Sequence, residues 1–233
     1  LTNLKIGKKG SGSSNDFGGD LGEILIFNRQ LSVVEEAKVV DHLAHKWGAL
    51  TPTTFVPSDL STLKLWLDAS DASSLTASSG TVSQWNDKSG NGNHMTATGD
   101  PSTGSRSFNG KNVIDLDGDD YFLSSGAYAT GNEFSLLMVT GIDVINNTND
   151  SIFGTHDTVG TPSFQIMAGD ESSFQFRFGN ASMGSAKTYS NSDQKGPGIY
   201  EFVFSLQSYT SEGFLNGISL GTTAVRLIPT TRS

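Results

Sequence analysis

The best candidate for a cation site in this sequence is a run of aspartates. The sequence V-I-D-L-D-G-D-D-Y-F at 113–122 contains Asp115, Asp117, Asp119 and Asp120. Carboxylate oxygens that lie close together are ligands that Ca²⁺ prefers. The run is not an EF-hand loop, because its sixth and twelfth positions are Asp120 and Gly126, where that loop carries Gly and Glu. It predicts either a calcium site or a polar turn between two strands.

Histidines offer weaker candidates. His42 and His45 lie three residues apart, as two metal ligands on one helix face would, but no third ligand follows nearby. We expect a solvated or capping role for both. His94, in the loop S-G-N-G-N-H, could touch a ligand, although a structural role is the simpler interpretation.

Aromatic residues suggest a shallow glycan site. Tyr121 and Tyr128 stand beside the acidic run, and together with His94 they are the candidate glycan-binding residues. The three tryptophans could also stack on sugars, but aromatic residues in alternating strands more often belong to the core. We therefore assign Trp47, Trp66 and Trp85 to the interior.

The amino-acid composition of the chain excludes several classes of partner and site. The chain has 15 basic and 24 acidic residues, a net charge of −9, so it lacks a basic stripe for phosphates and we expect no nucleic-acid partner. It has no cysteine, which excludes disulfides and thiolate zinc sites. No apolar stretch is long enough to span a bilayer, so no membrane insertion is expected. Since the chain starts at Leu1 and no stop-like feature precedes Ser233, we expect a piece of something longer.

One helix is expected, near residues 33–47. Ser32 and Glu35 have the S-x-x-E spacing of a capping box, and Gly48 is a natural stop. Apolar residues recur at steps of three and four and predict one buried face, made of Val33, Ala37, Val40, Ala44 and Trp47. Pro52 and Pro57 then mark residues 51–61 as a linker.

From residue 62 onward the chain is expected to be all β. Short runs such as 63–68, 81–85 and 174–178 are separated by turn clusters, and Asn216-Gly217 is a strong hairpin signal. Many short strands joined by turns predict an antiparallel β-sandwich of the jelly-roll type.

Three stretches resemble the laminin-G-like, or concanavalin A-like lectin-glucanase, superfamily in its bacterial or viral three-motif form. They are L-K-L-W-L-D-A-S-D at 63–71 with W-N-D-K-S-G-N-G-N-H at 85–94, V-I-D-L-D-G-D-D-Y-F at 113–122, and G-G-D-L-G-E-I-L-I-F-N-R-Q-L-S at 18–32 with H-K-W-G at 45–48. With the hairpin they cover most of the chain. The resemblance implies a concanavalin A-like sandwich and makes calcium plausible, held by Asp87, Asp117, Asp119 and Asp120.

The order of these stretches departs from the family. The third stretch, which closes the family's sandwich at its C-terminus, stands first here. Residues 1–50 would thus be the closing strand pair and helix, and 62–233 the main part. A sandwich without its closing strands exposes an edge and an apolar face, so Ile24, Ile26, Phe27 and Trp47 must dock on a partial sandwich. That sandwich could be their own, the preceding repeat of a tandem array, or a neighbouring copy.

The function expected from these observations is non-enzymatic. Glucanases of the superfamily carry a Glu-x-Asp-x-x-Glu strand, and no such motif occurs here, so no catalytic residue is assigned and glycoside hydrolysis is the least favoured outcome. We expect an extracellular structural or adhesive repeat of a surface or fibre protein, bacterial or viral, whose partners are neighbouring copies or repeats. The alternative is a calcium-assisted lectin-like module that binds a polysaccharide or a cell-surface glycan.

Overall fold

The computed structural model describes residues 4–8, 17–47, 55–124, 133–144, 150–154, 163–170, 173–179, 185–190, 198–205, 210–215 and 218–224. Over these residues the chain is almost entirely β, and every strand pairing is antiparallel. A single α-helix, α1 (Val33–Trp47), accompanies the strands in this described part. The prediction of an antiparallel all-β fold with one short helix is confirmed.

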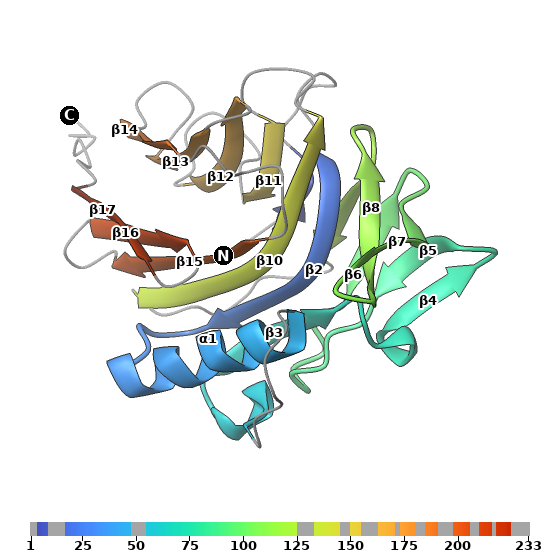
Figure 1. The fold of residues 1–233 in the computed structure, drawn as a ribbon, viewed down its shortest axis with the longest axis horizontal. Helices are drawn as coiled ribbons and strands as arrows, with labels where there is room; N and C mark the ends of the chain where they lie inside the picture. The colour runs from blue at the N-terminus through green and yellow to red at the C-terminus, as the bar shows by residue number, and fades with distance from the viewer. Residues whose placement is uncertain are drawn as a thin grey trace, which may run out of the picture.

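The sheet is strongly curled and forms two layers (Figure 1). The first layer runs β17-β16-β15-β10-β2, and β2 then pairs with β8 through its first residues and with β3 through its last. Its strands are β2 (Gly18–Phe27), β3 (Leu63–Asp68), β7 (Ser102–Phe108), β8 (Lys111–Asp117), β10 (Glu133–Val144), β15 (Gly198–Ser205), β16 (Thr210–Leu215) and β17 (Ile218–Ala224).

The second layer runs β14-β13-β12-β11-β1-β9-β6-β5-β4. Its strands are β1 (Lys5–Ile6), β4 (Leu75–Ser78), β5 (Thr81–Trp85), β6 (Met95–Thr98), β9 (Tyr121–Ser124), β11 (Asp150–Gly154), β12 (Ser163–Asp170), β13 (Ser173–Gly179) and β14 (Ser185–Ser190). β7 pairs with β8 in the first layer and, at Ser102, with Thr81 of β5 in the second, so the two layers are continuous. The short 3-10 helices η1 (Pro57–Asp59) and η2 (Ala72–Ser74) lie before and after β3.

β2 is buried on both faces, which explains its continuous apolar sequence. Ile24 and Ile26 point into the core between the layers, whereas Leu25 and Phe27 belong to a second apolar cluster on the outer face, beneath α1. All ten residues of β2 are buried. Full burial of an aliphatic or aromatic side chain contributes about 1.5–3 kcal/mol, so this strand is a main source of stability.

A bulge at Gly22 fits the helix to the sheet. The pairing of β2 with β10 shifts by one residue there, since Glu23 faces Val139 and Leu21 faces Thr140. A Cβ atom on Gly22 would lie 3.0 Å from the ring of Trp47. Glycine therefore lets the indole lie directly on the strand.

The helix begins as predicted but turns a different face to the sheet. Ser32 N donates to Glu35 Oε2 at 2.9 Å and Glu35 N donates to Ser32 Oγ at 3.4 Å, so the capping box is present. The buried apolar residues are Val39, Leu43 and Trp47, four residues apart, while Val33 is 81% exposed. The predicted face is partly correct, since Trp47 is buried and Val40 packs half-buried against the same outer apolar cluster. It is wrong for Val33 and Ala37, which are exposed, and Ala44 is half-buried.

The predicted linker is not extended in its second half. Residues 55–61 contain η1, and Phe55 and Leu60 pack against the outer apolar cluster. Residues 51–54 lie outside the described part. No helix among the described residues combines the length and hydrophobicity that crossing a bilayer requires.

Candidate functional site

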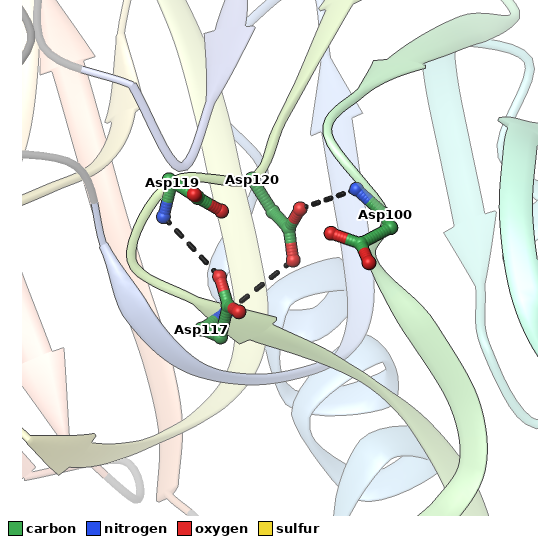
Figure 2. A group of neighbouring side chains, drawn as sticks. All are labelled: Asp100, Asp117, Asp119 and Asp120. Atoms are coloured by element: carbon green, nitrogen blue, oxygen red, sulfur yellow. Dashed lines mark hydrogen bonds between the residues drawn. The ribbon is translucent and has the colours of Figure 1, made fainter.

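Four acidic residues gather where the turn between β8 and β9 meets the turn between β6 and β7 (Figure 2). Asp117 ends β8, Asp119 and Asp120 follow in the turn to β9, and Asp100 comes from the turn between β6 and β7. One carboxylate oxygen from each of the four lies within 4.8 Å of the others. Asp120 is 2% exposed and the other three are exposed. The group has the donor type and the spacing that a hard cation such as Ca²⁺ requires.

Backbone amides hold the central carboxylate of this group. Asp100 N donates to Asp120 Oδ1 at 2.6 Å, and Asp117 N donates to Asp120 Oδ2 at 3.4 Å. Gly99 precedes this contact with φ +86°, and a Cβ atom there would collide with Asp120 Oδ1. The turn is thus shaped around the Asp120 side chain, with glycine needed at position 99.

The charge of Asp120 is poorly compensated. Burial raises the pKa of Asp120 to about 6, and the neighbouring carboxylates of Asp117 and Asp100 add to this rise, while the two amide donors oppose it. A bound cation would offset the mutual repulsion. What this arrangement can do chemically is bind a cation or take up a proton.

Three of the four predicted metal ligands come together here, and Asp87 does not. Its carboxylate accepts from Trp66 N and Ser89 N through Oδ1, and from Ser89 Oγ and Asn93 N through Oδ2, at 2.8–3.0 Å. Asp87 therefore organises the 87–93 loop. Sequence reasoning missed Asp100, which the pairing of Thr98 with Tyr121 brings to the cluster. Asp100 and Asp120 are 20 residues apart, so a search for ligands that are close in sequence does not find their contact.

The candidate glycan residues do not form one platform. Tyr121 is half-buried, and Lys8 Nζ lies 4.6 Å from the centre of its ring, so a cation covers one face of the ring. His94 is exposed, and its Nδ1 lies 3.0 Å from the backbone N of Asp87, as an acceptor would. Tyr128 lies outside the described residues.

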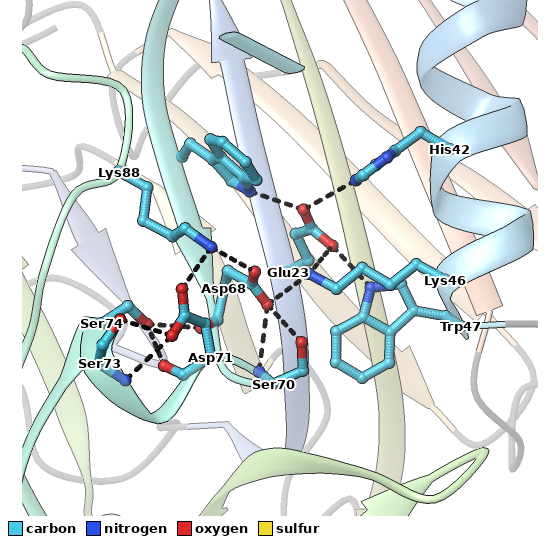
Figure 3. Close-up of polar contacts among 11 residues, drawn as sticks. Glu23, His42, Lys46, Trp47, Asp68, Ser70, Asp71, Ser73, Ser74 and Lys88 are labelled. Carbon is cyan, nitrogen blue, oxygen red and sulfur yellow. Dashed lines mark hydrogen bonds and ion pairs between the residues drawn. The ribbon is translucent and has the colours of Figure 1, made fainter. Parts of the chain in front are cut away.

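A second polar cluster lies under α1 and centres on Glu23 of β2 (Figure 3). Glu23 is fully buried. Its Oε2 accepts from Trp47 Nε1 and its Oε1 accepts from Trp66 Nε1, both at 2.7 Å. Two indoles thus act as hydrogen-bond donors to one buried carboxylate, which satisfies the rule that buried charges be partnered. The assignment of Trp47, Trp66 and Trp85 to the interior agrees with their burial.

Two lysines extend this cluster into a chain of ion pairs. Lys46 Nζ of α1 lies 3.1 Å from Glu23 Oε2 and 2.5 Å from Asp68 Oδ1 of β3. Lys88 Nζ lies 2.9 Å from Asp68 Oδ2 and 2.6 Å from Asp71 Oδ2. Burial raises the pKa of Asp68, but the charges and hydrogen bonds of Lys46 and Lys88 outweigh burial and hold it below the usual range. We call Glu23, Lys46, Asp68, Asp71 and Lys88 the buried ion network.

The histidines of α1 have separate partners. His42 Nδ1 lies 3.3 Å from Phe55 O, and His42 Nε2 lies 3.6 Å from Glu23 Oε1 at the edge of the buried ion network. His45 Nδ1 lies 2.6 Å from Asp41 O on its own helix. The group of described residues that could hold a metal contains neither histidine, and the solvated or capping role expected for both stays a prediction.

The predicted interface residues dock on their own chain in this structure. Ile24, Ile26 and Phe27 are 0% exposed and Trp47 is 6% exposed. β2 lies between β10 on one side and β3 with β8 on the other. β1, in contrast, pairs with β9 and β11 in the second layer, so β1 and β2 complete different layers.

Comparison with protein-family models, with curated proteins and with solved structures finds no match to this chain. The resemblance to the laminin-G-like superfamily therefore rests on the sequence stretches alone and stays a prediction. What the chain does must be argued from its own geometry.

Proposed function

We propose that this chain is a non-enzymatic extracellular module of a surface or fibre protein, and that such modules are joined by strand complementation. In this proposal residues 17–47, which we call the closing segment, complete a sandwich whose remainder, residues 55–224, we call the receiving part. The observation that carries the proposal is the central position of β2. An N-terminal strand is inserted between strands that come from three distant parts of the chain.

The bonds of the closing segment support this role. β2 makes its ladders with β10, β3 and β8, all of which belong to the receiving part. Outside the strands, Leu31 N donates to Ser135 Oγ at 3.3 Å, and Asn28 N donates to Thr62 O at 3.1 Å. The receiving part would make the same contacts with a closing segment from its own chain and with one from a neighbouring copy. Either source can therefore supply the segment.

The polar clusters support a non-enzymatic role. Glu23 and Asp68, the cross-strand carboxylates on the outer face, are 0% and 3% exposed. Their oxygens are occupied by indoles, lysines and Ser70. A carboxylate pair that hydrolyses a glycoside must reach its substrate, and this pair is sealed under α1. The proposal therefore assigns these carboxylates to holding the helix.

Exchange between full-length chains tests the proposal. The chain has no cysteine, so one copy can carry a donor dye at Val34→Cys on the closing segment and another an acceptor at Ser78→Cys on β4. After joint unfolding and refolding at high concentration, we expect energy transfer between copies and a dimer mass by light scattering. Monomers without intermolecular transfer at every concentration would contradict strand complementation.

A matched control uses a covalent tie across the junction. In the double variant Asn28→Cys, Thr62→Cys, oxidation would link the closing segment to its own receiving part beside the 3.1 Å backbone hydrogen bond. The reduced protein is expected to exchange and the oxidised protein to remain monomeric.

The second candidate is a calcium-assisted lectin-like module, which the aspartate cluster favours. If it binds Ca²⁺, we expect a dissociation constant of about 10⁻⁴–10⁻³ M, as in other extracellular modules, by isothermal titration. The double variant Asp117→Asn, Asp119→Asn is expected to lose binding, while Asp59→Asn, an exposed aspartate of η1, leaves it unchanged. Equal heats for all three proteins would remove this candidate. A glycan array with and without Ca²⁺, and with Tyr121→Ala, then tests the sugar.

A further inference from the structure

Among the described residues, two ion pairs of opposite polarity cross the junction between the closing segment and the receiving part. Lys46 of the closing segment lies 2.5 Å from Asp68 of the receiving part. Asp20 of the closing segment has its Oδ2 2.9 Å from Arg106 Nη2 of the receiving part. A segment with the reverse charges would meet like charges at both places, so the junction distinguishes among segments by charge as well as by apolar fit.

Resting on the proposed strand complementation, we propose that the Lys46–Asp68 pair selects which closing segment a receiving part accepts, and that the selected segment can come from a second copy of this chain. In the exchanged dimer each copy contributes Glu23 and Lys46 to the partner's buried ion network, and Trp47 as a hydrogen-bond donor to Glu23. Neither network is complete without the other copy.

Burial makes the Lys46–Asp68 pair selective. The side chains of Lys46 and Asp68 are 15% and 4% exposed. Breaking a buried ion pair by altering one partner is strongly destabilising, because the other charge is left buried without compensation. Lys46 also lies 3.1 Å from Glu23, so a carboxylate at position 46 would face two buried carboxylates at once. A mismatched segment is therefore rejected by repulsion as well as by the loss of an attraction.

The second pair contributes less to this selection. Arg106 is 37% exposed, and an exposed guanidinium is screened by solvent. Burial raises the pKa of Asp20 despite Arg106, which means that the guanidinium does not fully compensate the carboxylate. Selection by charge thus depends mainly on the pair under α1.

A second copy is the partner that fits. It carries the same Lys46 and the same β2 sequence, so an exchanged segment restores each contact of the native junction. Residues 48–54 connect Trp47 to Phe55, and seven residues span at most about 25 Å when extended. Exchange of an identical element costs little once the connection can reach, because the folded contacts are the same in both forms.

Charge reversal in two full-length chains tests the inference. One chain carries Lys46→Glu, the other Asp68→Lys, and a third carries both changes. Each single variant is expected to melt about 10 °C below the native chain, because a buried pair is broken. The double variant restores the attraction between positions 46 and 68, but position 46 then repels Glu23 and position 68 repels Lys88. It is therefore expected to melt above both single variants and to recover part of the loss. Refolding the two single variants together should give a heterodimer, in which one junction is native and the other fully reversed.

The outcomes separate the inference from the function on which it rests. Single variants that melt like the native chain, or a double variant no more stable than the singles, would overturn selection by Lys46 and Asp68. A rescued double variant together with a mixture that stays monomeric would overturn strand complementation, while the pair still selects within one chain. Single variants that fold only when refolded together would support both.

A matched control reverses exposed charges on the same two parts. Lys38 is an exposed residue of α1 and Asp59 an exposed residue of η1. Chains carrying Lys38→Glu and Asp59→Lys are expected to melt within a few degrees of the native chain and to form no preferred heterodimer. A heterodimer in this control would show that general charge attraction, not the buried pair, causes the association, and it would overturn the inference.

Discussion

At the scale of single residues, Asp20 is a buried carboxylate whose charge is only partly compensated. It is 1% exposed, and its Oδ1 has no hydrogen-bond partner. Burial raises the pKa of Asp20 to about 6, Arg106 opposes the rise, and Asp115 adds to it. Because the folded chain binds this proton more tightly than the unfolded chain, Asp20 contributes stability that is present below its ordinary pKa and is lost as pH rises through about 6.

The variant Asp20→Asn is therefore expected to be more stable than the native chain at pH 7.5, by about 1 kcal/mol after the loss of the Arg106 contact. The advantage should vanish near pH 4, where Asp20 is protonated in the folded state. Thermal melts of both proteins at pH 4, 5, 6 and 7.5 measure the difference. Asp120, whose pKa is also raised, is present in both proteins, so its contribution to the pH dependence cancels in the difference between them. Melting curves whose separation does not change with pH would refute this account of Asp20.

At the scale of elements, the sequence predicted strands and a helix start well but missed the contacts between elements. The predicted runs 63–68 and 81–85 coincide with β3 and β5, because both have apolar residues that face the core. β4, β6, β7 and β14 were not predicted. β4 and β7 are rich in Ser, Thr and other small or polar residues and largely exposed, so the apolar period that marks a strand is absent.

The helix shows why the outer polar cluster could not be foreseen. The stripe that faces the sheet is Val39, His42, Leu43, Lys46 and Trp47, which follows the i, i+3, i+4, i+7, i+8 spacing of a helix face. Two of its five positions are polar, because the sheet presents the buried carboxylate of Glu23. A count of apolar residues assigns polar positions to solvent and therefore selects a neighbouring face. Lys46 and Asp68 are 22 residues apart in sequence, and their pairing follows from the docking of α1 on β3.

At the scale of the whole molecule, the N-terminal residues complete both layers. Residues 1–50 supply β1 between β9 and β11, and β2 between β10 and β3 with β8. Their removal leaves five strands of the two layers, β3, β8, β9, β10 and β11, each lacking one neighbouring strand. It also uncovers Leu63, Trp66, Leu137 and Val139 of the outer cluster. We expect residues 51–233 to aggregate and to show no cooperative melting transition, because open edges and a bare apolar face promote association.

A nicked chain provides the control for this deletion. A protease site inserted between residues 50 and 51 allows the two parts to be cut after folding. The strand ladders and the buried ion network hold the parts without a covalent link, so we expect the cut protein to elute as one species and to melt cooperatively. Circular dichroism melting and light scattering then compare the cut chain with the deletion. A monomeric, cooperatively melting 51–233 would mean that β1, β2 and α1 are dispensable, and strand complementation would then lack the instability that drives it.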